Sequence, residues 1–522
     1  MQKLIAKQQV VGQYNAICIF GDTFECCWMG ASDACNETQR SSFYQQAWEL
    51  IQRRKSRSLL DVMALNVCIP VSMLQAIRER PEQNVLLQKE ARLMAELSGA
   101  LPGDRPIIRN SLQSLRKTMK QDYLLNAAMR VRDGEGLTSD DLVYFMRTSN
   151  IGTQVVFVDW FTHLDLIFLF AAVVNKSRYH ISCHRLGISE STVSKWARSN
   201  LERHVLSNNE DAFLRLEELK DLITPLKIVS GPDDLLVLCP TAALHHIPLH
   251  ALQIDDDILL KRNPVVYVPS LSIFLHQFNI VERARVMQNS QPWRASVMSV
   301  YEDSNPQNPP HEVAAVRDCM SGLASALGTT VQSGPHVTVP YFQNYVHDTD
   351  LIHFHGHAVS GSSAKNQALV LQPLTSPSES LLSLDHHLTA RSIFTSLTLN
   401  RNPLVVNIAC NSGSQEIKSG DEPFGLTTAF LFAGANTVIG TLWPLKSADG
   451  RNFTKLFYGA MREQTRGERG VIVDVARAVQ QAALGIRCEE ATEAPYHWAS
   501  FVVCGLSMYP LGGEVAELGD GI

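Results

Sequence analysis

The amino-acid sequence predicts an α/β fold, in which a mostly parallel sheet has helices on both faces and follows an α-helical region. Up to about residue 150, apolar residues recur at helical intervals, whereas from about residue 235 near-continuous apolar segments alternate with amphipathic ones. This alternation is typical of parallel sheets that are buried on both faces. We therefore divide the chain into an α-helical region (1–149), an α/β domain (150–512) and a C-terminal tail (513–522).

Three helices are expected before residue 150. Residues 43–66 space their apolar side chains at helical intervals, and residues 84–100 repeat the pattern and stop at Gly99. The segment 111–132 predicts a third helix that is charged on one face. These helices could be the tail of a helical array, although no clear fixed-period repeat is visible.

The most hydrophobic stretch, residues 155–174, predicts two strands joined by a turn. It contains Asp159, His163 and Asp165, a charge load that a lipid-spanning helix rarely carries. Further strands are expected at "RYHISCHRL", "DLLVLCP", "PVVYVPS", "ASVMSVY", "DTDLIHFHGHA", "NPLVVNIAC" and "NTVIGTLWP", and helices at "HEVAAVRDCMSGLASAL" and "EPFGLTTAFLFAGA".

Charge and cysteine content restrict the class of protein. The chain has 46 basic and 52 acidic residues, a net charge of −6, and no block of basic residues, so neither a nucleic acid nor a membrane is expected as a partner. The 11 cysteines are an odd, scattered set, which favours reduced thiols and a cytoplasmic location over a disulfide framework. The first residues contain no apolar segment followed by a small-residue cleavage site, so no secretory signal is predicted.

Two expected strands end in residues that can carry chemistry. Functional residues of open α/β sheets collect beyond the carboxyl ends of the strands. Here one strand runs through "LIHFHGHA" and another ends at Cys410. Period-two alternation puts His353, His355 and His357 on one face of the first strand. If the two strands are neighbours, His357 and Cys410 face each other across the sheet edge, and a histidine about 53 positions before the cysteine matches the caspase arrangement.

With these two blocks, the chain resembles the CHAT domain, a caspase- and separase-like cysteine peptidase domain of clan CD that often follows tetratricopeptide repeats. The resemblance covers most of residues 150 to 510 and rests on five blocks in order: "PTAALHHIPLHAL" with "VPSLSIF", "HFHGHA", "IACNSG", "FGLTTAFLFAGANTVIGTLWPL" and "YHWASFVVCGL". "RRKSRSLLDVM" is similar to the helix that joins the repeats to the domain. The resemblance implies a caspase-like sheet with its catalytic part at about 290–512, and the remnant of an N-terminal repeat region.

The resemblance further implies a cysteine endopeptidase with His357 and Cys410 as the catalytic pair and no cofactor. A thiol with a pKa near 8.5 becomes a better nucleophile beside an imidazole, and the imidazole can protonate the leaving amine. The backbone N–H groups of Cys410 and of Gly356 or Ala358 are the expected donors to the oxyanion. The expected partners are a protein substrate and a regulatory protein that binds the N-terminal helices.

The chain departs from the family pattern at two places. Ala358 stands where a glycine usually follows the catalytic histidine, and "LWPLKSADG" lacks the acidic pair that often follows Trp-Pro. Asp421, Lys446 and Asp449 are therefore the candidates for binding the substrate side chain. Because the acidic groups outnumber the lysine, a basic substrate side chain is expected.

Two other classes stay open at this point. A caspase-like scaffold without activity would act by binding protein partners, and Ala358 is the feature that favours it. A zinc hydrolase would use His353, His355 and His357, since three imidazoles on one strand face can converge on a metal. No second ligand motif follows in the sequence, so no metal is expected.

Overall fold

This computed structural model describes most of the chain. The described residues are 13–62, 77–99, 103–132, 138–149, 151, 154–176, 178–201, 206–207, 209–271, 274–275, 277–278, 292–300, 310–334, 336–359, 366–371, 386–414, 416–418, 422–465 and 471–512. The predicted C-terminal tail, 513–522, lies outside them.

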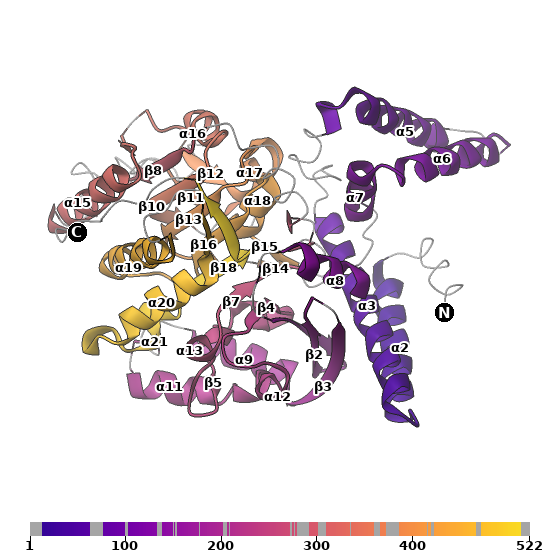
Figure 1. Cartoon of the computed structure of the whole chain (residues 1–522), viewed down its shortest axis with the longest axis horizontal. Coiled ribbons are helices and arrows are strands. Elements are labelled where there is room, and N and C mark those ends of the chain that lie inside the picture. Colours follow the sequence, from indigo (N-terminus) through magenta and orange to yellow (C-terminus); the bar gives the residue numbers. More distant parts are fainter. Residues whose placement is uncertain are drawn as a thin grey trace.

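A large, mostly parallel sheet forms the centre of the molecule (Figure 1). Its order is β12-β11-β10-β13-β16-β18-β7-β4-β1-β2-β3, and β8 pairs with β10 and β9. The strands are β1 (Val155–His163), β2 (Leu166–Val174), β3 (Tyr179–Ser189), β4 (Leu235–Cys239), β7 (Val265–Tyr267), β8 (Ala295–Ser299), β9 (Val331–Gln332), β10 (Leu351–Val359), β11 (Ala368–Val370), β12 (His387–Thr389), β13 (Leu404–Ala409), β16 (Thr437–Thr441) and β18 (Phe501–Gly505). Small two-stranded antiparallel sheets pair β5 (Gln253–Ile254) with β6 (Asp257–Ile258), β14 (Glu416–Lys418) with β15 (Glu422–Phe424), and β17 (Val471–Asp474) with β19 (Met508–Leu511).

The predicted hairpin in residues 155–174 is confirmed. Strands β1 and β2 pair antiparallel from Val155↔Val174 to His163↔Leu166, and Leu164 and Asp165 between them have positive φ. Asp165 supports the turn because its carboxylate accepts hydrogen bonds from the backbone N–H and the hydroxyl of Ser191. Of the residues that argued against a membrane helix, Asp165 lies in this turn, His163 is the last residue of β1, and Asp159 lies within β1. Among the described residues, no helix is long and apolar enough to cross a bilayer.

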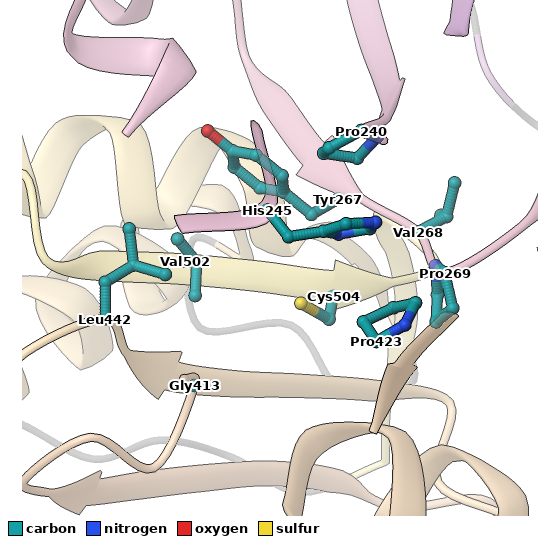
Figure 2. A pocket seen from close by; sticks show the side chains of 10 residues that line it. All are labelled: Pro240, His245, Tyr267, Val268, Pro269, Gly413, Pro423, Leu442, Val502 and Cys504. Carbon is teal, nitrogen blue, oxygen red and sulfur yellow. The ribbon is translucent and has the colours of Figure 1, made fainter. Parts of the chain in front are cut away.

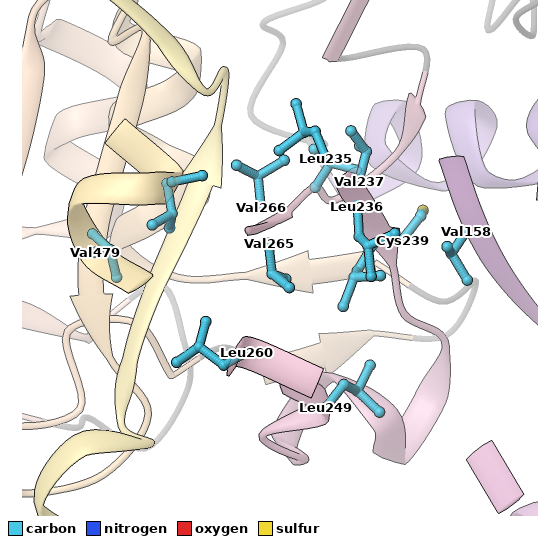
Figure 3. Close-up of a cluster of buried hydrophobic side chains, with 14 of the residues drawn as sticks. Val158, Leu235, Leu236, Val237, Cys239, Leu249, Leu260, Val265, Val266 and Val479 are labelled. Carbon is cyan, nitrogen blue, oxygen red and sulfur yellow. The ribbon is translucent and has the colours of Figure 1, made fainter. Parts of the chain in front are cut away.

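Helices cover both faces of the sheet, as predicted. The helices after β3 are α9 (Glu190–Asn200), α11 (Asn209–Glu217), α12 (Leu226–Val229), α13 (Leu259–Arg262), α15 (Pro310–Ala326), α16 (Val339–Val346), α17 (Ala390–Ser396), α18 (Leu426–Ala433), α19 (Ser447–Thr465), α20 (Val475–Arg487) and α21 (Pro495–Trp498). Helices α16, α17 and α18 pack with Phe354 and Val405 in one buried cluster, whereas α15, α19 and α20 belong to the cluster that contains Val406 and Ile408. Consecutive residues of β13 therefore point into different layers, as the pleat of a doubly covered strand requires. Figure 3 shows part of the second cluster around β4 and β7, with Val479 of α20.

The N-terminal helices form two groups. Helices α2 (Gln13–Ser32), α3 (Glu37–Val62) and α8 (Ser139–Thr148) share the core of the sheet, through Phe24, Trp48 and Phe145. Helices α5 (Pro81–Gly99), α6 (Arg105–Met119) and α7 (Tyr123–Arg132) contribute to a separate small core, which the view in Figure 1 shows away from the sheet.

The prediction of one helix over residues 111–132 is wrong, because α6 and α7 are separate helices. The chain turns at Lys120–Asp122, and the Asp122 carboxylate accepts a hydrogen bond of 2.9 Å from the N–H of Leu125. A side-chain acceptor of this kind satisfies an N–H at the start of a new helix. The other two predicted helices correspond to α3 and α5, although residues 63–66 lie outside the described chain.

A buried ion pair joins α3 to the sheet. Lys55 and Asp159 are 2% and 0% exposed, and Nζ lies 2.6 Å from the carboxylate. The ammonium also donates to the carbonyls of Cys239 (3.1 Å) and Pro240 (3.0 Å), and Gln52 donates to Asp159. Burial raises the pKa of Asp159, although Lys55 opposes the shift. The helix predicted to precede the domain is therefore tied to the middle of β1 and to the carboxyl end of β4.

We expect Lys55→Met to lower the free energy of unfolding by about 3–5 kcal/mol, because it leaves the Asp159 carboxylate buried without its cation. The double variant Lys55→Met/Asp159→Leu removes both charges, and we expect it to recover much of this loss. Urea denaturation of the full chain, followed by circular dichroism, measures both. A loss under about 1 kcal/mol in the single variant would show that the pair does not hold α3.

Candidate functional site

Strands β10 and β13 are parallel neighbours, which meets the condition on which the sequence placed His357 and Cys410 together. The register runs from Leu351↔Leu404 to Gly356↔Ala409. His357 and Cys410 are the residues that follow this last pair along the chain, so the two lie at the same edge of the sheet. Strand β10 continues to Val359, because β11 replaces β8 as its second partner beyond Gly356.

Gly356 lies at this change of partner and has little room for a side chain. A Cβ atom there would lie 2.4 Å from Cγ2 of Val300, the residue that follows β8. Ala358, two positions on, lies opposite Leu369 in the antiparallel β10–β11 pair and is not among the residues with positive φ. The alanine that replaces the expected glycine therefore adopts a conformation that is open to any residue.

The three histidines of β10 lie on one face of the sheet, as the alternation predicted. Phe354, between the first two, packs in the cluster of α16–α18 on the other face. His353 and His355 are buried with ring centroids 6.3 Å apart, and His353 Nδ1 lies 3.2 Å from the hydroxyl of Tyr458 on α19. His357 is half-buried, because the third position on this face reaches the sheet edge.

Burial keeps these imidazoles neutral at neutral pH. Desolvation lowers the pKa of His357 below its usual value. It also lowers the pKa of His355 to about 3, with a further effect from Arg451 and His357. A neutral His357 can accept a proton, which is the state that a general base requires.

Cys410 lies in the turn directly after β13 and is half-buried. Its thiol is not in a disulfide, and Sγ lies 4.0 Å from the carbonyl oxygen of Leu445. Asn411, the next residue, has a φ of 57°, a conformation that asparagine tolerates better than most residues. The chain thus reverses immediately after the cysteine.

Hydrogen bonds from neighbouring strands hold the loop after Cys410. Gln367 Nε2 donates to the carbonyls of Asn411 (2.7 Å) and Ser414 (3.2 Å), and its Oε1 accepts from the N–H of Leu426 (3.0 Å). Ser412 Oγ donates to the Asn407 carbonyl and accepts from the N–H of Thr441. These supporting residues could not be recognised from the sequence, because a glutamine or a serine carries no sign there of the group that it will contact.

Two glycines bring this loop onto β16. A Cβ at Gly413 would lie 2.9 Å from the backbone nitrogen of Thr441, and one at Gly440 would lie 2.8 Å from backbone atoms of Gly413. The N–H of Gly413 donates to the Thr441 carbonyl at 2.9 Å. Backbone contact at this distance requires glycine at both positions.

The three candidate substrate-binding residues have different environments. Lys446 is exposed and directly follows Leu445, whose carbonyl faces Cys410. Asp449 is 4% exposed, and its carboxylate lies 2.9 Å from Nδ1 of His497 on α21. Asp421 lies outside the described residues. Of the two described candidates, only Lys446 presents its charge to solvent.

An open hollow lies beside the loop that follows Cys410 (Figure 2). Gly413 lines it, together with Leu442 and with residues from the carboxyl ends of β4 and β7; the full lining is Pro240, His245, Tyr267, Val268, Pro269, Gly413, Pro423, Leu442, Val502 and Cys504. In Figure 2 the His245 ring lies across its middle, near Cys504. Neither His357 nor Cys410 is in the lining, so this hollow is beside the candidate site and not at it.

The described residues contain no group of three or more histidine, cysteine or acidic side chains that could hold a metal ion. His353 and His355 point under α19, where a Cβ at Gly450 would lie 3.4 Å from the His355 ring. The three histidines of β10 thus share a face but do not converge.

Fold and site define an α/β protein with a histidine and a cysteine just beyond the last paired residues, Gly356 and Ala409, of two neighbouring parallel strands. Residues 213–506, more than half of the chain, match the CHAT domain. The chain therefore belongs to the CHAT domain family.

Human tetratricopeptide repeat protein 28 is 23% identical over 309 residues, which are 52% of this chain but 12% of that protein. Among solved structures, the chain is similar to one in the Saccharomyces cerevisiae separase–securin complex, with a TM-score of 0.48 and 12% identity over 92% of this chain and 38% of that chain. For the Arg-specific cysteine proteinase gingipain R, the TM-score is 0.34 and the identity 10%, over 63% of this chain and 77% of that chain. At these identities no residue role is carried over.

We expect Gln367→Leu to lower the free energy of unfolding by about 2–4 kcal/mol, because it leaves buried carbonyls and an N–H without partners. Amide hydrogen exchange at residues 410–414 should become faster than in wild type. Gln343→Leu is the matched control, because it removes only a surface hydrogen bond to Ser396, and its effect should stay within about 0.5 kcal/mol. Unchanged exchange in the Gln367 variant would contradict the role of this side chain.

Stability should also fall in mild acid. Burial lowers the pKa of His250 to about 4 and that of His355 to about 3. The unfolded chain binds protons at these histidines below about pH 6.5, whereas the folded chain does not, so stability is lost as the pH falls from about 6.5 towards 4. The loss should reach about 2 kcal/mol per histidine near pH 5. Urea midpoints across this range measure the loss of stability. In His355→Gln, the total loss should be smaller by the contribution of that one histidine.

Proposed function

We propose that this chain is a cysteine endopeptidase that cleaves a protein substrate through His357 and Cys410. The observation that carries the proposal is the register of β10 and β13, in which Gly356 is opposite Ala409 and the two reactive side chains follow. Membership of the CHAT family supports it. No cofactor enters the reaction.

In the proposed reaction, His357 takes the proton of the Cys410 thiol, and the thiolate attacks the peptide carbonyl carbon. The tetrahedral oxyanion collapses, the C–N bond breaks, and the amine leaves with the proton from His357. Water then attacks the thioester, His357 accepts its proton, and the carboxylic acid leaves as the thiol re-forms. The lowered pKa of His357 is in keeping with a base that is neutral before the attack.

The oxyanion requires donors that are in place before the reaction. The backbone N–H groups of Cys410 and of Gly356 or Ala358 are the proposed donors. The rigidity of the two chain segments that carry these N–H groups supports their proposed role. Gly356 is paired with Ala409 of β13 and packed against Val300, and the turn of Cys410 is fixed by Gln367 and Ser412.

The N-terminal helices are the proposed contact for a regulatory protein. Helix α3 packs against β15, and the hairpin β14–β15 follows the Cys410 loop directly. A partner that shifts α3 would therefore act on the segment next to the site. A reducing compartment such as the cytoplasm would keep the Cys410 thiol available.

We expect Cys410→Ala and His357→Ala each to abolish cleavage with little change in fold. Both positions lie at the sheet edge and outside the main core, so the free energy of unfolding should change by at most about 1–2 kcal/mol. New protein N-termini in cells that express wild type, compared with each variant, identify the substrates by mass spectrometry.

Cys488→Ala is the matched control, because Cys488 is exposed at the end of α20 and should be dispensable. Labelling by a peptide with a thiol-reactive electrophile should occur at Cys410 and disappear in Cys410→Ala. Cleavage that persists in Cys410→Ala would sink the proposal, and a folded wild type that neither cleaves nor labels would favour a scaffold.

A further inference from the structure

We propose that Lys446 is a specificity-determining residue that selects a carboxylate side chain next to the bond that is cleaved. The substrate class rests on the proposed function, whereas the position of the lysine charge beside Cys410 can be tested without it. The inference reverses the expectation of a basic substrate side chain, which depended on Asp421 and Asp449.

The segment that carries Lys446 faces the reactive thiol. The Leu445 carbonyl oxygen lies 4.0 Å from Cys410 Sγ, and Lys446 is the next residue. Its own carbonyl accepts from the N–H of Asp449 (3.1 Å) and of Gly450 (3.3 Å), so its backbone is fixed to the start of α19. The exposed side chain therefore begins at a defined point close to Cys410.

Hydrogen bonds to helix α21 hold the segment 443–449 in place. Trp443 Nε1 donates to the Tyr496 carbonyl at 2.9 Å, and the Tyr496 hydroxyl donates to the Pro444 carbonyl at 2.7 Å. The third contact is the one between His497 and Asp449, at 2.9 Å. We assign Tyr496 and His497 as positioning residues, because their hydrogen bonds fix both ends of the segment 443–449.

The neighbouring charges on α19 are already paired. The Asp449 carboxylate is buried and lies 2.9 Å from Nδ1 of His497, so it is not open to a substrate side chain. Arg451 donates to Glu312 at 2.5 Å and to the Ser447 hydroxyl at 2.9 Å. Among the described residues from 443 to 451, Lys446 is thus the one whose charge is exposed and shows no ion pair.

In the proposed arrangement, a carboxylate that approaches Cys410 passes close to this ammonium. An exposed charge several ångströms away acts through water and is screened by salt, so its effect on rate is modest, about two- to fivefold. A preference of this kind raises the local concentration of the anionic substrate and leaves the chemical step unchanged.

Alkylation of Cys410 by two small reagents tests the charge directly. In each reaction the thiolate attacks the CH₂ carbon, an S–C bond forms, iodide leaves with the bonding electrons, and the thiol proton goes to solvent. Iodoacetate is an anion and iodoacetamide is neutral, so the ratio of their rates reports the local potential. Mass spectrometry of the peptide that contains Cys410 measures each rate, and exposed Cys488 in the same sample is the reference.

We expect Lys446→Gln to lower the iodoacetate-to-iodoacetamide ratio at Cys410 about two- to fivefold and to leave the ratio at Cys488 unchanged. Added salt should lower the wild-type ratio towards that of the variant. Lys195→Gln, which removes an exposed lysine on α9, is the matched control and should change neither ratio. An unchanged ratio at Cys410 in Lys446→Gln overturns the proposal.

Tyr496→Phe keeps the ring and removes only the hydrogen bond to Pro444. We expect a smaller fall in the Cys410 ratio, because the segment and its lysine are held less closely. A purely structural role would lower stability without changing the ratio, and that result overturns the assignment of Tyr496.

Peptide electrophiles with Asp, Leu or Lys next to the reactive group then test the substrate class. Wild type should label fastest with Asp, and Lys446→Gln should lose that preference. If the alkylation ratio depends on Lys446 but no peptide electrophile labels the protein, the proposed peptidase activity is contradicted, whereas the position of the lysine charge is supported. Labelling fastest with Lys in wild type would contradict the selectivity and leave the peptidase supported.

Discussion

The parallel pairing of β10 with β13 is the constraint on which the site depends. Both strands are buried on both faces, and each side chain fits one of two different helical layers. A slip of one residue would exchange the layers, so that Phe354 would face α19 and the histidines would face α16–α18. Ordinary core packing thus fixes the relative positions of His357 and Cys410, and no direct bond between the two is needed to align them.

A second constraint is the polar network beneath the Cys410 loop. The loop lies over β16, where two glycines bring the backbones together and Ser412 and Gln367 satisfy the buried carbonyls. Every such group would be costly to bury alone, so the conformation is over-determined. The turn of Cys410 therefore has little conformational freedom to lose, because Gln367 and the backbone of β16 hold the loop that follows it.

The arrangement of strands could be predicted because it depends on pattern. Interrupting charges in residues 155–174 indicated a hairpin, and continuous apolar runs indicated parallel strands. The break between α6 and α7 could not be predicted, because it is a short turn within an otherwise helical pattern, where the Asp122 carboxylate accepts from the N–H of Leu125. The hydrogen bonds that hold the site could not be predicted either, because their partners are distant in the chain. Examples are Gln367 with Asn411 and Tyr496 with Pro444. A sequence shows which groups can bond but not which ones meet.

The buried Lys55 has a consequence for where the folding unit begins. A change in composition marks residue 150, yet the carboxylate of Asp159 inside the sheet obtains its counter-ion from a helix about one hundred residues upstream. A fragment that starts at the first strand would carry an uncompensated charge in its interior, and would have to protonate it, hydrate it or separate β1 from the end of β4. The composition changes at residue 150, but the stability of the sheet also depends on helix α3, which supplies the cation for its buried carboxylate.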